Sequence, residues 1–405
     1  MSEAGHGSGA EATGAASQLA GLLDREPGEW RRDLDARYGV LDDVLAARRA
    51  AVVYPAARMG REAAARLRAM GANVVALGDR DMSLHGNVID GLPVLSPAEI
   101  ARSHASDVIL VASTMFDSAI REDLLQRGCA EVVPVGYLNL RLPRVFRSRE
   151  YEGAYGAVTD PASRAAIREL YGLLADDQSR RVLTGKVTFY LGLDKRQLED
   201  VRSRDPLYFD PTVYELGSQE TVVDGGAFVG DTLESFLHAS GGDFSAYHAF
   251  EPDEASFGRL AQLASADPSR ITVVRAGLGS RRGSARLLGT GKADSRLLSA
   301  DEPGDEETPV VSLDEYFDGL RLPSLIKMDV EGWEEQALMG AKRVLAEARP
   351  KVAVSVYHSP HDLWSIPLQL NRLLPDASLF LRHYTREVDD TVCYAIPEDR
   401  QPRRA

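Results

Sequence analysis

The sequence predicts two α/β domains, each built on a mainly parallel sheet, with a helical segment between them. Two observations predict this fold class. Short apolar strands alternate with helical patterns over residues 41–140 and again over residues 218–405. The last two strands, Ser378–His383 and Val392–Ile396, have no helical pattern between them. Alternation predicts parallel strands joined by helices, and the missing helix predicts that the final strand runs antiparallel.

The composition excludes several classes of protein. At 405 residues the chain is too long for one ordinary domain, and 44% hydrophobic with 27% charged residues is typical of globular proteins. No apolar run approaches the roughly 20 residues that span a bilayer, so we expect no membrane partner. The net charge of −14 argues against nucleic acid, whose binding requires a concentrated basic surface.

The cysteines and the N-terminus favour a cytoplasmic protein. Cys129 and Cys393 lie far apart without metal-ligand spacing, in apolar contexts, which predicts reduced packing residues. Residues 1–18 are mostly Gly, Ala, Ser, Thr and Glu and lack the basic start and apolar core of a signal peptide, so we interpret them as a disordered tail. The oligomeric state stays open, and a homo-oligomer is one alternative.

Residues 19–140 predict N-terminal helices followed by a small Rossmann-like domain. Apolar residues recur at helical spacing over residues 19–49, with a break at Pro27-Gly28. Strands and helices then alternate over 51–54, 61–70, 73–77, 107–112, 117–127 and 131–135. The unit is therefore an open α/β fold of the βαβ type.

The first loop of this domain is degenerate as a nucleotide-binding loop. It reads Y-P-A-A-R-M-G, so Pro55, Ala56 and Ala57 stand where a phosphate cradle needs glycines, and only Gly60 remains. Asp79 follows the second strand, where a ribose-binding acid would lie, although a surface aspartate in a turn is commoner. Substrate recognition, subunit contact and a plain scaffold remain open as roles for this domain.

Residues 141–217 predict a helical bridge between the domains. Asp160-Pro161 opens a helical pattern through Leu174, and a second pattern covers 182–191. The stretch 205–214, D-P-L-Y-F-D-P-T-V-Y, is dense in aromatic residues and proline. It either packs on the following domain or covers the mouth of a pocket.

The second domain, residues 218–405, begins with a strand, a glycine loop and a helix. Val222 and Val223 belong to a buried strand, the Asp-Gly-Gly of residues 224–226 turns the chain, and a helical pattern starts at Asp231-Thr232. The glycines fall as G-G-x-x-x-G behind an aspartate, which differs from the dinucleotide fingerprint G-x-G-x-x-G. A carboxylate at the strand end suits a ligand with an ammonium group, which favours S-adenosylmethionine.

The next strand supports the same ligand. Residues 247–250 are apolar and end in Glu251-Pro252, where an acid can accept hydrogen bonds from both hydroxyls of a ribose. Further elements follow: a helix over 255–263, a strand over 271–275, a hairpin with a mobile loop over 277–309, a strand over 325–328, a helix over 333–348, a strand over 351–357 and a helix over 367–374. A doubly wound sheet that finishes with an antiparallel strand is the Rossmann-like class I architecture of S-adenosylmethionine-dependent methyltransferases.

Four motifs together resemble the FkbM family of methyltransferases over about residues 205–397. They are V-V-D-G-G-A-F-V-G-D-T, A-F-E-P, L-I-K-M-D-V-E-G-W-E and S-V-Y-H-S-P-H-D-L-W-S-I-P. The third is similar to the family's K-x-D-x-E-G-x-E signature. The resemblance implies S-adenosylmethionine as cofactor and hydroxyl groups of sugars or secondary metabolites as acceptors. It implies cofactor contacts by Asp224, Gly226, Gly230 and Glu251, and we expect the site to include their neighbours Gly225, Ala227, Phe228, Asp231, Thr232, Pro252 and Ala276.

Methyl transfer to an alcohol also requires alignment and removal of a proton. Alignment alone is worth roughly 7 to 11 kcal/mol, and an alcohol is a poor nucleophile unless a general base or a metal acts on its hydroxyl. Lys327, Asp329 and Glu331 lie at the end of the fourth strand, where ligands of α/β sheets bind. A lysine in an apolar strand requires a charged partner, which Asp329 and Glu331 could supply, so these residues either fix the loop or act on the acceptor.

His358 ends the fifth strand and is our candidate for the general base. His361 and Asp362 more plausibly cap the following helix, and His383 is a core or rim residue. Asp329, Glu331 and His358 could hold a divalent cation, but their spacing is loose, so we assign no metal ligands from the sequence.

The leading hypothesis is an O-methyltransferase acting on a hydroxyl of a sugar-containing or other polar small molecule. Methylation at nitrogen or carbon stays open. One alternative is a nucleotide-sugar-modifying oxidoreductase that uses the first domain, against which the missing glycines at Pro55–Ala57 argue. Another is a binding protein with an inactive methyltransferase fold, against which the intact set of Asp224, Gly226, Gly230 and Glu251 argues.

Overall fold

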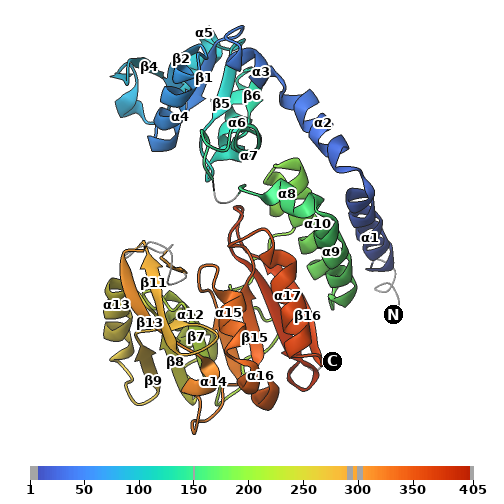
Figure 1. Cartoon of the computed structure of the whole chain (residues 1–405), viewed down its shortest axis with the longest axis vertical. Coiled ribbons are helices and arrows are strands. Elements are labelled where there is room, and N and C mark those ends of the chain that lie inside the picture. The colour runs from blue at the N-terminus through green and yellow to red at the C-terminus, as the bar shows by residue number, and fades with distance from the viewer. Residues whose placement is uncertain (1–7, 149–150, 290–294, 299–303, 402–405) are drawn as a thin grey trace, which may run out of the picture. The chain divides into compact units, whose positions relative to one another are not determined.

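The chain folds into two compact units, each with its own sheet (Figure 1). The fold is that of a computed structural model, which describes residues 8–148, 151–289, 295–298 and 304–401. The N-terminal unit comprises residues 13–164 and 184–200, and the C-terminal unit is built mainly from residues 165–183 and 201–405. The predicted bridge thus contributes residues to both units.

The N-terminal unit is organised on a six-stranded sheet in the order β3-β4-β2-β1-β5-β6. Its strands are β1 (Ala51–Tyr54), β2 (Val74–Gly78), β3 (Val88–Ile89), β4 (Leu92–Leu95), β5 (Val108–Val111) and β6 (Glu131–Val133). All neighbouring strands pair in parallel except β3 with β4. The short hairpin β3–β4 is absent from the sequence prediction, and β6 ends earlier than predicted because Pro134 leads into the helix α7 (Val135–Arg141).

The helical patterns predicted within residues 19–49, 61–70 and 117–127 are helices in the structure, and this unit contains further helices that the sequence analysis did not predict. The helices of the unit include α2 (Pro27–Tyr38), α3 (Val40–Leu45), α4 (Arg58–Ala69), α5 (Pro97–Ser103), α6 (Asp117–Gln126) and α8 (Ala154–Thr159), with a 3₁₀ turn η1 (Met82–Leu84). Helix α5 begins with a capping box in which Ser96 and Glu99 satisfy each other's backbone amides. Beyond α8 lie α9 (Pro161–Leu173), α10 (Asp177–Gly192) and α11 (Arg196–Glu199), which form the helical bridge that the sequence predicts.

The prediction of a disordered tail over residues 1–18 is wrong for residues 8–18. These residues form the first turns of α1 (Ser8–Asp24), whereas residues 1–7 lie outside the described part of the chain. Alanine, the strongest helix former, recurs through this stretch. The helix continues into Leu19 and Leu23, which are buried. Favourable propensity together with this apolar anchor outweighs the two glycines in the stretch.

The C-terminal unit contains a seven-stranded sheet in the order β16-β17-β15-β14-β7-β8-β9. Its strands are β7 (Thr221–Gly225), β8 (Ala246–Phe250), β9 (Ile271–Val274), β14 (Leu325–Met328), β15 (Lys351–Ser355), β16 (Ala377–His383) and β17 (Thr391–Pro397). Strand β17 runs antiparallel to both neighbours, β15 and β16, while β9 through β15 pair in parallel. The predicted methyltransferase-type sheet with an antiparallel last strand is confirmed.

The local sequence explains why β7 lies in the interior of this sheet, between β14 and β8. All five of its residues are buried, and the β-branched Val222 and Val223 pack against both faces. The covering helices include α12 (Asp231–Ser240) and α13 (Glu254–Ala264), and Phe236 and Leu260 from these helices join the buried core. Asp253 caps α13 by accepting the amide hydrogen of Ser256 at 2.8 Å.

Residues 277–311 form more ordered structure than the predicted hairpin and mobile loop. A second, four-stranded sheet has the order β10-β13-β11-β12. Its strands are β10 (Gly277–Leu278), β11 (Gly283–Leu288), β12 (Arg296–Leu298) and β13 (Glu306–Val311). The hairpin corresponds to β11 and β12, and the buried residues Ala285, Leu287, Leu297 and Val310 give the sheet its own apolar cluster. Residues 290–294 and 299–303 of the predicted loop lie outside the described residues.

The single helix predicted over residues 333–348 is two helices, α15 (Glu334–Met339) and α16 (Lys342–Ala348). The carboxylate of Asp314, which lies in α14 (Leu313–Tyr316), accepts the amide hydrogens of Arg343 and Val344 at 2.9 Å each. Those amides lie at the start of α16, where a helix has unsatisfied donors. A partner distant in sequence therefore stabilises a second helix start. Helix α17 (Asp362–Leu373) precedes β16, and the 3₁₀ turn η2 (Glu398–Arg400) follows β17.

No helix within the described residues combines the length and the apolar character that crossing a membrane requires.

Candidate functional site

A cavity of about 370 Å³ opens in the C-terminal unit at the carboxyl ends of β7, β8 and β14. Strand β8 lies on one side of β7 and β14 on the other, so the cavity occupies the point where the strand order reverses, as in other open α/β sheets. Ten residues predicted from the sequence line it: Gly226, Phe228, Asp231, Thr232, Glu251, Pro252, Ala276, Lys327, Asp329 and Glu331.

Five predicted site residues are not part of the cavity lining. Asp224, Gly225 and Ala227 are buried within and beside β7. Gly230 begins α12 with φ 98°, and a Cβ atom there would lie 2.6 Å from a methyl group of Leu263. His358 is buried behind the wall that Asp329 and Glu331 form.

The sequence analysis missed several lining residues, above all Tyr208, Tyr357 and Asp390. The aromatic stretch 205–214 has both of its alternative roles: Leu207 and Tyr208 line the cavity, while Phe209, Val213 and Tyr214 pack in the core of the C-terminal unit. The density of aromatic residues was the available signal. Asp390 comes from the loop between β16 and β17, and only the three-dimensional sheet order brings that loop to the cavity.

Gly226 permits the close approach of two loops at the cavity. Its φ is 72°, and a Cβ atom at this position would lie 1.8 Å from the carbonyl oxygen of Asp329. Glycine is therefore required twice, by the backbone conformation and by the neighbouring backbone. The loop after β7 and the loop after β14 can meet only because this residue has no side chain.

Glu251 is held in the cavity wall by two backbone hydrogen bonds. Its Oε2 accepts the amide hydrogen of Phe228 at 2.8 Å, and its Oε1 accepts that of Asp253 at 2.8 Å. The side chain is largely buried, and this burial raises the pKa of Glu251 to about 7 despite the two hydrogen bonds. The carboxyl group is thus fixed in orientation and titrates near neutral pH.

Asp224 does not face the cavity, which corrects its predicted role as a direct cofactor contact. Its side chain is fully buried, with Oδ1 2.9 Å from Nζ of Lys327 and Oδ2 accepting a hydrogen bond from the hydroxyl of Tyr247 at 2.7 Å. Lys327 also donates to the carbonyl oxygens of Gly225 and Gly226. The ammonium group that Asp224 binds therefore belongs to the protein.

The same ion pair corrects the predicted partner of Lys327. The sequence suggested Asp329 or Glu331, which follow Lys327 on the same strand end. The register instead places Asp224 directly opposite Lys327 on the neighbouring strand β7. A cross-strand partner satisfies the buried ammonium, so the carboxylates of Asp329 and Glu331 remain at the cavity.

Asp329 is oriented by two tyrosines of the cavity wall. Its Oδ2 accepts a hydrogen bond from the hydroxyl group of Tyr208 at 2.6 Å, and the hydroxyl group of Tyr357 is shared between Oδ1 at 3.3 Å and Oδ2 at 3.4 Å. Burial alone would raise the pKa of Asp329, but the positive charges of His358 and Lys327 and the bond from Tyr208 together lower it below its usual value. Asp329 is therefore ionised at neutral pH.

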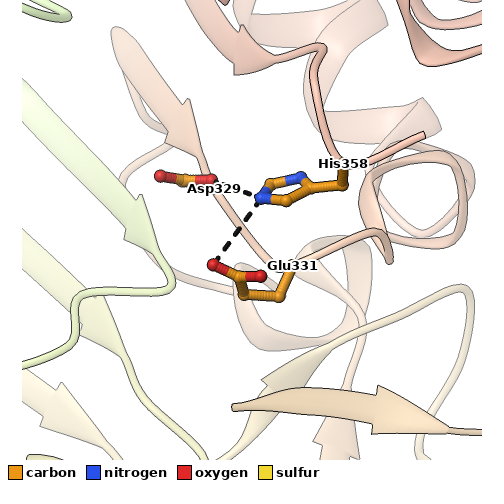
Figure 2. A group of neighbouring side chains, drawn as sticks. All are labelled: Asp329, Glu331 and His358. Atoms are coloured by element: carbon orange, nitrogen blue, oxygen red, sulfur yellow. Dashed lines mark ion pairs between the residues drawn. The ribbon is translucent and has the colours of Figure 1, made fainter. Parts of the chain in front are cut away.

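His358 lies between the carboxylates of Asp329 and Glu331 (Figure 2). Its Nε2 is 3.3 Å from Oδ1 of Asp329 and 3.6 Å from Oε1 of Glu331, and its Nδ1 is 3.0 Å from Oε1 of Glu334. Burial alone would lower the pKa of His358, but Glu334, Glu331 and Asp329 raise it well above its usual value. Without a bound cation this environment favours the protonated imidazole, which argues against the predicted role as general base.

The remaining histidine and acid predictions fall outside the cavity. His361 is the N-cap residue of α17 without a side-chain bond to the helix, and Asp362, the first residue of α17, accepts the amide hydrogen of Ser359 at 2.6 Å. His383 is fully buried, with Nδ1 2.9 Å from the hydroxyl oxygen of Thr391, and is a core residue. Both cysteines are buried and free, as predicted.

In the N-terminal unit, Asp79 anchors the degenerate loop after β1. Its Oδ2 accepts the amide hydrogen of Ala56 at 2.9 Å, and its Oδ1 accepts that of Asp81 at 2.9 Å. A Cβ atom on Gly60 would lie 1.9 Å from the carbonyl oxygen of Pro55, so this glycine lets the helix α4 pack against the loop. Both residues thus have a structural role in the loop.

The fold and the site define a class of protein. The strand order, the antiparallel β17 and the cavity over β7 are those of Rossmann-like methyltransferases. Residues 224–388 match the family model described as "Methyltransferase FkbM domain". This part of the chain is an FkbM methyltransferase domain, as the sequence motifs indicated.

A solved structure agrees on the fold. The methyltransferase FkbM of Methylobacillus flagellatus KT is similar over 95% of this chain and 99% of its own, with 23% identity and a TM-score of 0.71. At this identity the similarity establishes the fold alone. The fibrillarin of Aeropyrum pernix, solved with bound S-adenosyl-L-methionine, matches 44% of this chain and 67% of its own at 12% identity with a TM-score of 0.29, too low for an argument. No curated protein matches the chain.

Proposed function

We propose that the protein is an S-adenosylmethionine-dependent methyltransferase that methylates a hydroxyl group of a sugar-containing or other polar small molecule. The observation on which the proposal rests is Glu251, a buried carboxyl group fixed at the carboxyl end of β8 in the cavity wall. Each of its oxygens accepts one backbone amide hydrogen and retains a further acceptor position. These positions suit the two hydroxyls of a ribose.

The charge of the cavity also favours this cofactor. Its lining includes five carboxyl groups, those of Asp231, Glu251, Asp329, Glu331 and Asp390. Among the described lining residues Lys327 is the one lysine, and it is paired with Asp224. Such a wall attracts a sulfonium cation and repels the pyrophosphate of a dinucleotide. Apolar lining residues, among them Pro252, Ala276 and Leu278, supply contacts for an adenine ring.

The same charge restricts the acceptor. A phosphorylated or otherwise anionic acceptor would meet Asp329 and Glu331 at the cavity wall, whereas a neutral hydroxyl can donate a hydrogen bond to either carboxylate. In this proposal Asp329 and Glu331 orient the acceptor hydroxyl, and one of these two carboxylates takes its proton as the methyl group is transferred in line from sulfur to oxygen, which leaves S-adenosylhomocysteine. Most of the rate acceleration comes from that alignment.

Calorimetric titration of the full chain with S-adenosylmethionine, and separately with NADH, tests the cofactor. The proposal requires binding of S-adenosylmethionine and of its product S-adenosylhomocysteine, with no heat from NADH. Binding of NADH alone would overturn the proposal and favour an oxidoreductase. Absence of binding by all three ligands would favour a binding protein with an inactive methyltransferase fold.

The methylated atom requires a separate measurement. Incubation with S-adenosylmethionine carrying a ¹³C-labelled methyl group and a panel of glycosides and polyols is expected to give a labelled product whose methyl chemical shift is that of an O-methyl ether. A chemical shift typical of N-methyl or C-methyl groups would support methyltransferase activity but reject methylation at oxygen.

A further inference from the structure

Three side chains converge at the cavity wall with the spacing of metal ligands. The atoms are Nε2 of His358, Oδ1 of Asp329 and Oε1 of Glu331, all within 4.8 Å of one another. The imidazole nitrogen is 3.3 Å from the first oxygen and 3.6 Å from the second (Figure 2). Ligand atoms each about 2.0 to 2.2 Å from one metal ion are themselves roughly 3 to 3.5 Å apart. We propose that Asp329, Glu331 and His358 bind one divalent cation.

The imidazole of His358 provides the second, independent observation. Its side chain is only 4% exposed, and Nε2 points between the two carboxylates. Neither contact has hydrogen-bond geometry, and Nε2 has no other hydrogen-bond partner among the described residues. A buried nitrogen without a hydrogen bond is costly in a folded protein, and a coordinated cation would satisfy it by taking the place of the Nε2 proton.

The other ring nitrogen, Nδ1, faces a buried carboxylate, in a contact that also lacks hydrogen-bond geometry. Nδ1 lies 3.0 Å from Oε1 of Glu334, a carboxylate that is itself almost fully buried. The same oxygen accepts the amide hydrogen of Val330 at 2.9 Å, which fixes its position. Metal-binding histidines commonly present their second nitrogen to such a carboxylate, which sets the tautomer and the ring orientation.

The side chain of Asp329 and the backbone at Glu331 are also held in place before any cation arrives. The other oxygen of Asp329, Oδ2, accepts a hydrogen bond from the hydroxyl of Tyr208 at 2.6 Å, and the hydroxyl of Tyr357 lies between the two oxygens, 3.3 Å from Oδ1 and 3.4 Å from Oδ2. Glu331 has φ 55° and Gly332 has φ 94°, so the chain makes a left-handed turn at Glu331, which is unfavourable for a residue with a side chain. Non-glycine residues in this conformation are concentrated at functional sites.

The ligand set indicates the kind of cation. Two carboxylates and one imidazole suit ions that accept both oxygen and nitrogen donors, such as Mn²⁺ or Zn²⁺, better than Ca²⁺, which prefers oxygen alone. Because Asp329 and Glu331 line the cavity, the open coordination positions face the bound molecule. There the cation would bind the acceptor hydroxyl and make its proton more acidic, a role that rests on the proposed function.

A second grouping shares the imidazole but is the weaker candidate. Glu334, His358 and Asp362 also bring three donor atoms together. In this grouping Glu334 accepts a backbone amide hydrogen with the oxygen that faces His358, and Asp362 accepts that of Ser359. Neither Glu334 nor Asp362 lines the cavity. We therefore assign the cation to Nε2 and treat this grouping as an outcome of the test.

The test uses Mn²⁺ alone, added to the full chain and followed by the electron paramagnetic resonance signal of the free ion. We expect one site per chain, at least 10-fold weaker binding in Glu331→Gln and Asp329→Asn, and about 10-fold weaker binding in Glu334→Gln, which alters only the partner of Nδ1. Glu335→Gln is the matched control, because this exposed neighbour lies outside both groupings. It should bind Mn²⁺ as the unaltered chain does.

Two results would overturn the assignment. One is absence of Mn²⁺ binding at millimolar concentration, and the other is unchanged binding in Glu331→Gln with loss in Asp362→Asn, which would move the ion to the second grouping. Circular dichroism spectra of each variant establish that it is folded. The Mn²⁺ measurement contains no cofactor, so it is independent of the proposed function. Mn²⁺ binding without S-adenosylmethionine binding would support the metal site and reject the proposed function. S-adenosylmethionine binding without Mn²⁺ binding would support the proposed function and reject the metal site.

Discussion

Asp79 in the N-terminal unit and Glu251 in the C-terminal unit hold the same position in two different sheets. Each follows the strand next to the first strand of its sheet, β2 beside β1 and β8 beside β7. Asp79 accepts the amide hydrogens of Ala56 and Asp81, and Glu251 accepts those of Phe228 and Asp253. Both acids therefore tie the first loop of their sheet to the end of the second strand.

What differs is the loop to which each acid is tied. After β7 the chain passes through Gly226 and Phe228, both with positive φ, and these two residues line the cavity. After β1 it passes through Pro55 and Ala56. Gly60, in α4, packs closely against this loop. An acid at a strand end is thus a structural feature of both sheets. The cavity lies at the loop after β7, where Gly226 and Phe228 have positive φ values.

The two sheets also differ beneath the loop. Asp224 in β7 pairs with Lys327 in the adjacent strand β14, whereas the equivalent neighbours β1 and β5 contain only buried apolar or aromatic residues. A buried ion pair costs desolvation energy that a packed apolar pair avoids. Its presence in one sheet alone, directly under the cavity, indicates that it supports the site: Lys327 donates to the carbonyl oxygens of Gly225 and Gly226.

Breaking this ion pair should have the largest effect. Lys327→Met leaves the carboxylate of Asp224 buried without its cation, and we expect the free energy of unfolding to fall by about 3 to 5 kcal/mol. Urea unfolding followed by tryptophan fluorescence measures this, because Trp333 and Trp364 both belong to the C-terminal unit.

The double variant Lys327→Met with Asp224→Asn is the control for this prediction. The amide retains an acceptor for the hydroxyl of Tyr247 and removes the buried charge, so most of the lost stability should return. If the single and double variants are equally unstable, the loss comes from packing of the lysine side chain instead of from charge.

Gly226→Ala should have the next largest effect. A methyl group would meet the carbonyl oxygen of Asp329 at 1.8 Å in a backbone conformation that itself costs roughly 1 to 2 kcal/mol for alanine. We expect at least about 2 kcal/mol of destabilisation and loss of S-adenosylmethionine binding. The contrasting variant is Ala57→Gly in the first loop of the other sheet, an exposed residue at the start of α4, which should change stability by less than about 0.5 kcal/mol.

The two acids can be compared directly by matched amide substitutions. Hydrogen bonds to a charged group are worth about 1.5 to 3 kcal/mol, so Glu251→Gln should weaken S-adenosylmethionine binding by roughly 10- to 100-fold in calorimetric titration. Asp79→Asn should leave this affinity unchanged, because Asp79 is absent from the cavity lining. Equal losses in both variants would show that these acids act only as loop anchors.

Much of this fold could be predicted from the sequence because its signals are local. Strands such as β7 and β5 are continuous apolar runs, and helices such as α4 and α6 end at glycines 71 and 128. The errors arose where a distant partner decides the structure. Asp314 starts α16 inside what reads as one helix, and the sheet containing β10 and β13 depends on pairing across 33 residues of sequence from Gly277 to Val310.

The site residues show the same difference between local signals and distant partners. Glu251, Gly226 and the strand-end acids could be found because position at the end of a strand determines exposure to the cavity. The roles of Asp224 and His358 could not be derived. The first depends on strand register, which places Lys327 opposite Asp224. The second depends on three carboxylates that approach one imidazole and reverse its expected protonation at neutral pH.

The pH dependence of cofactor affinity should give the smallest effect and the finest distinction between the acids. Burial raises the pKa of Glu251 to about 7 from its usual 4.5, so the free protein takes up a proton there as the pH falls below 7. Only the carboxylate accepts from both ribose hydroxyls and attracts the sulfonium, so affinity should fall by up to about 10-fold per pH unit below 7 and level off above 8. Folding stability without cofactor should change in the opposite direction, since a proton bound more tightly in the folded state stabilises that state between pH 7 and 4.5. Calorimetric titrations with S-adenosylmethionine from pH 5.5 to 8.5 should show this loss of affinity in the unaltered chain and in Asp79→Asn. The affinity of Glu251→Gln should not change with pH. A pH dependence that survives in Glu251→Gln would assign the titration to another carboxyl group of the cavity wall.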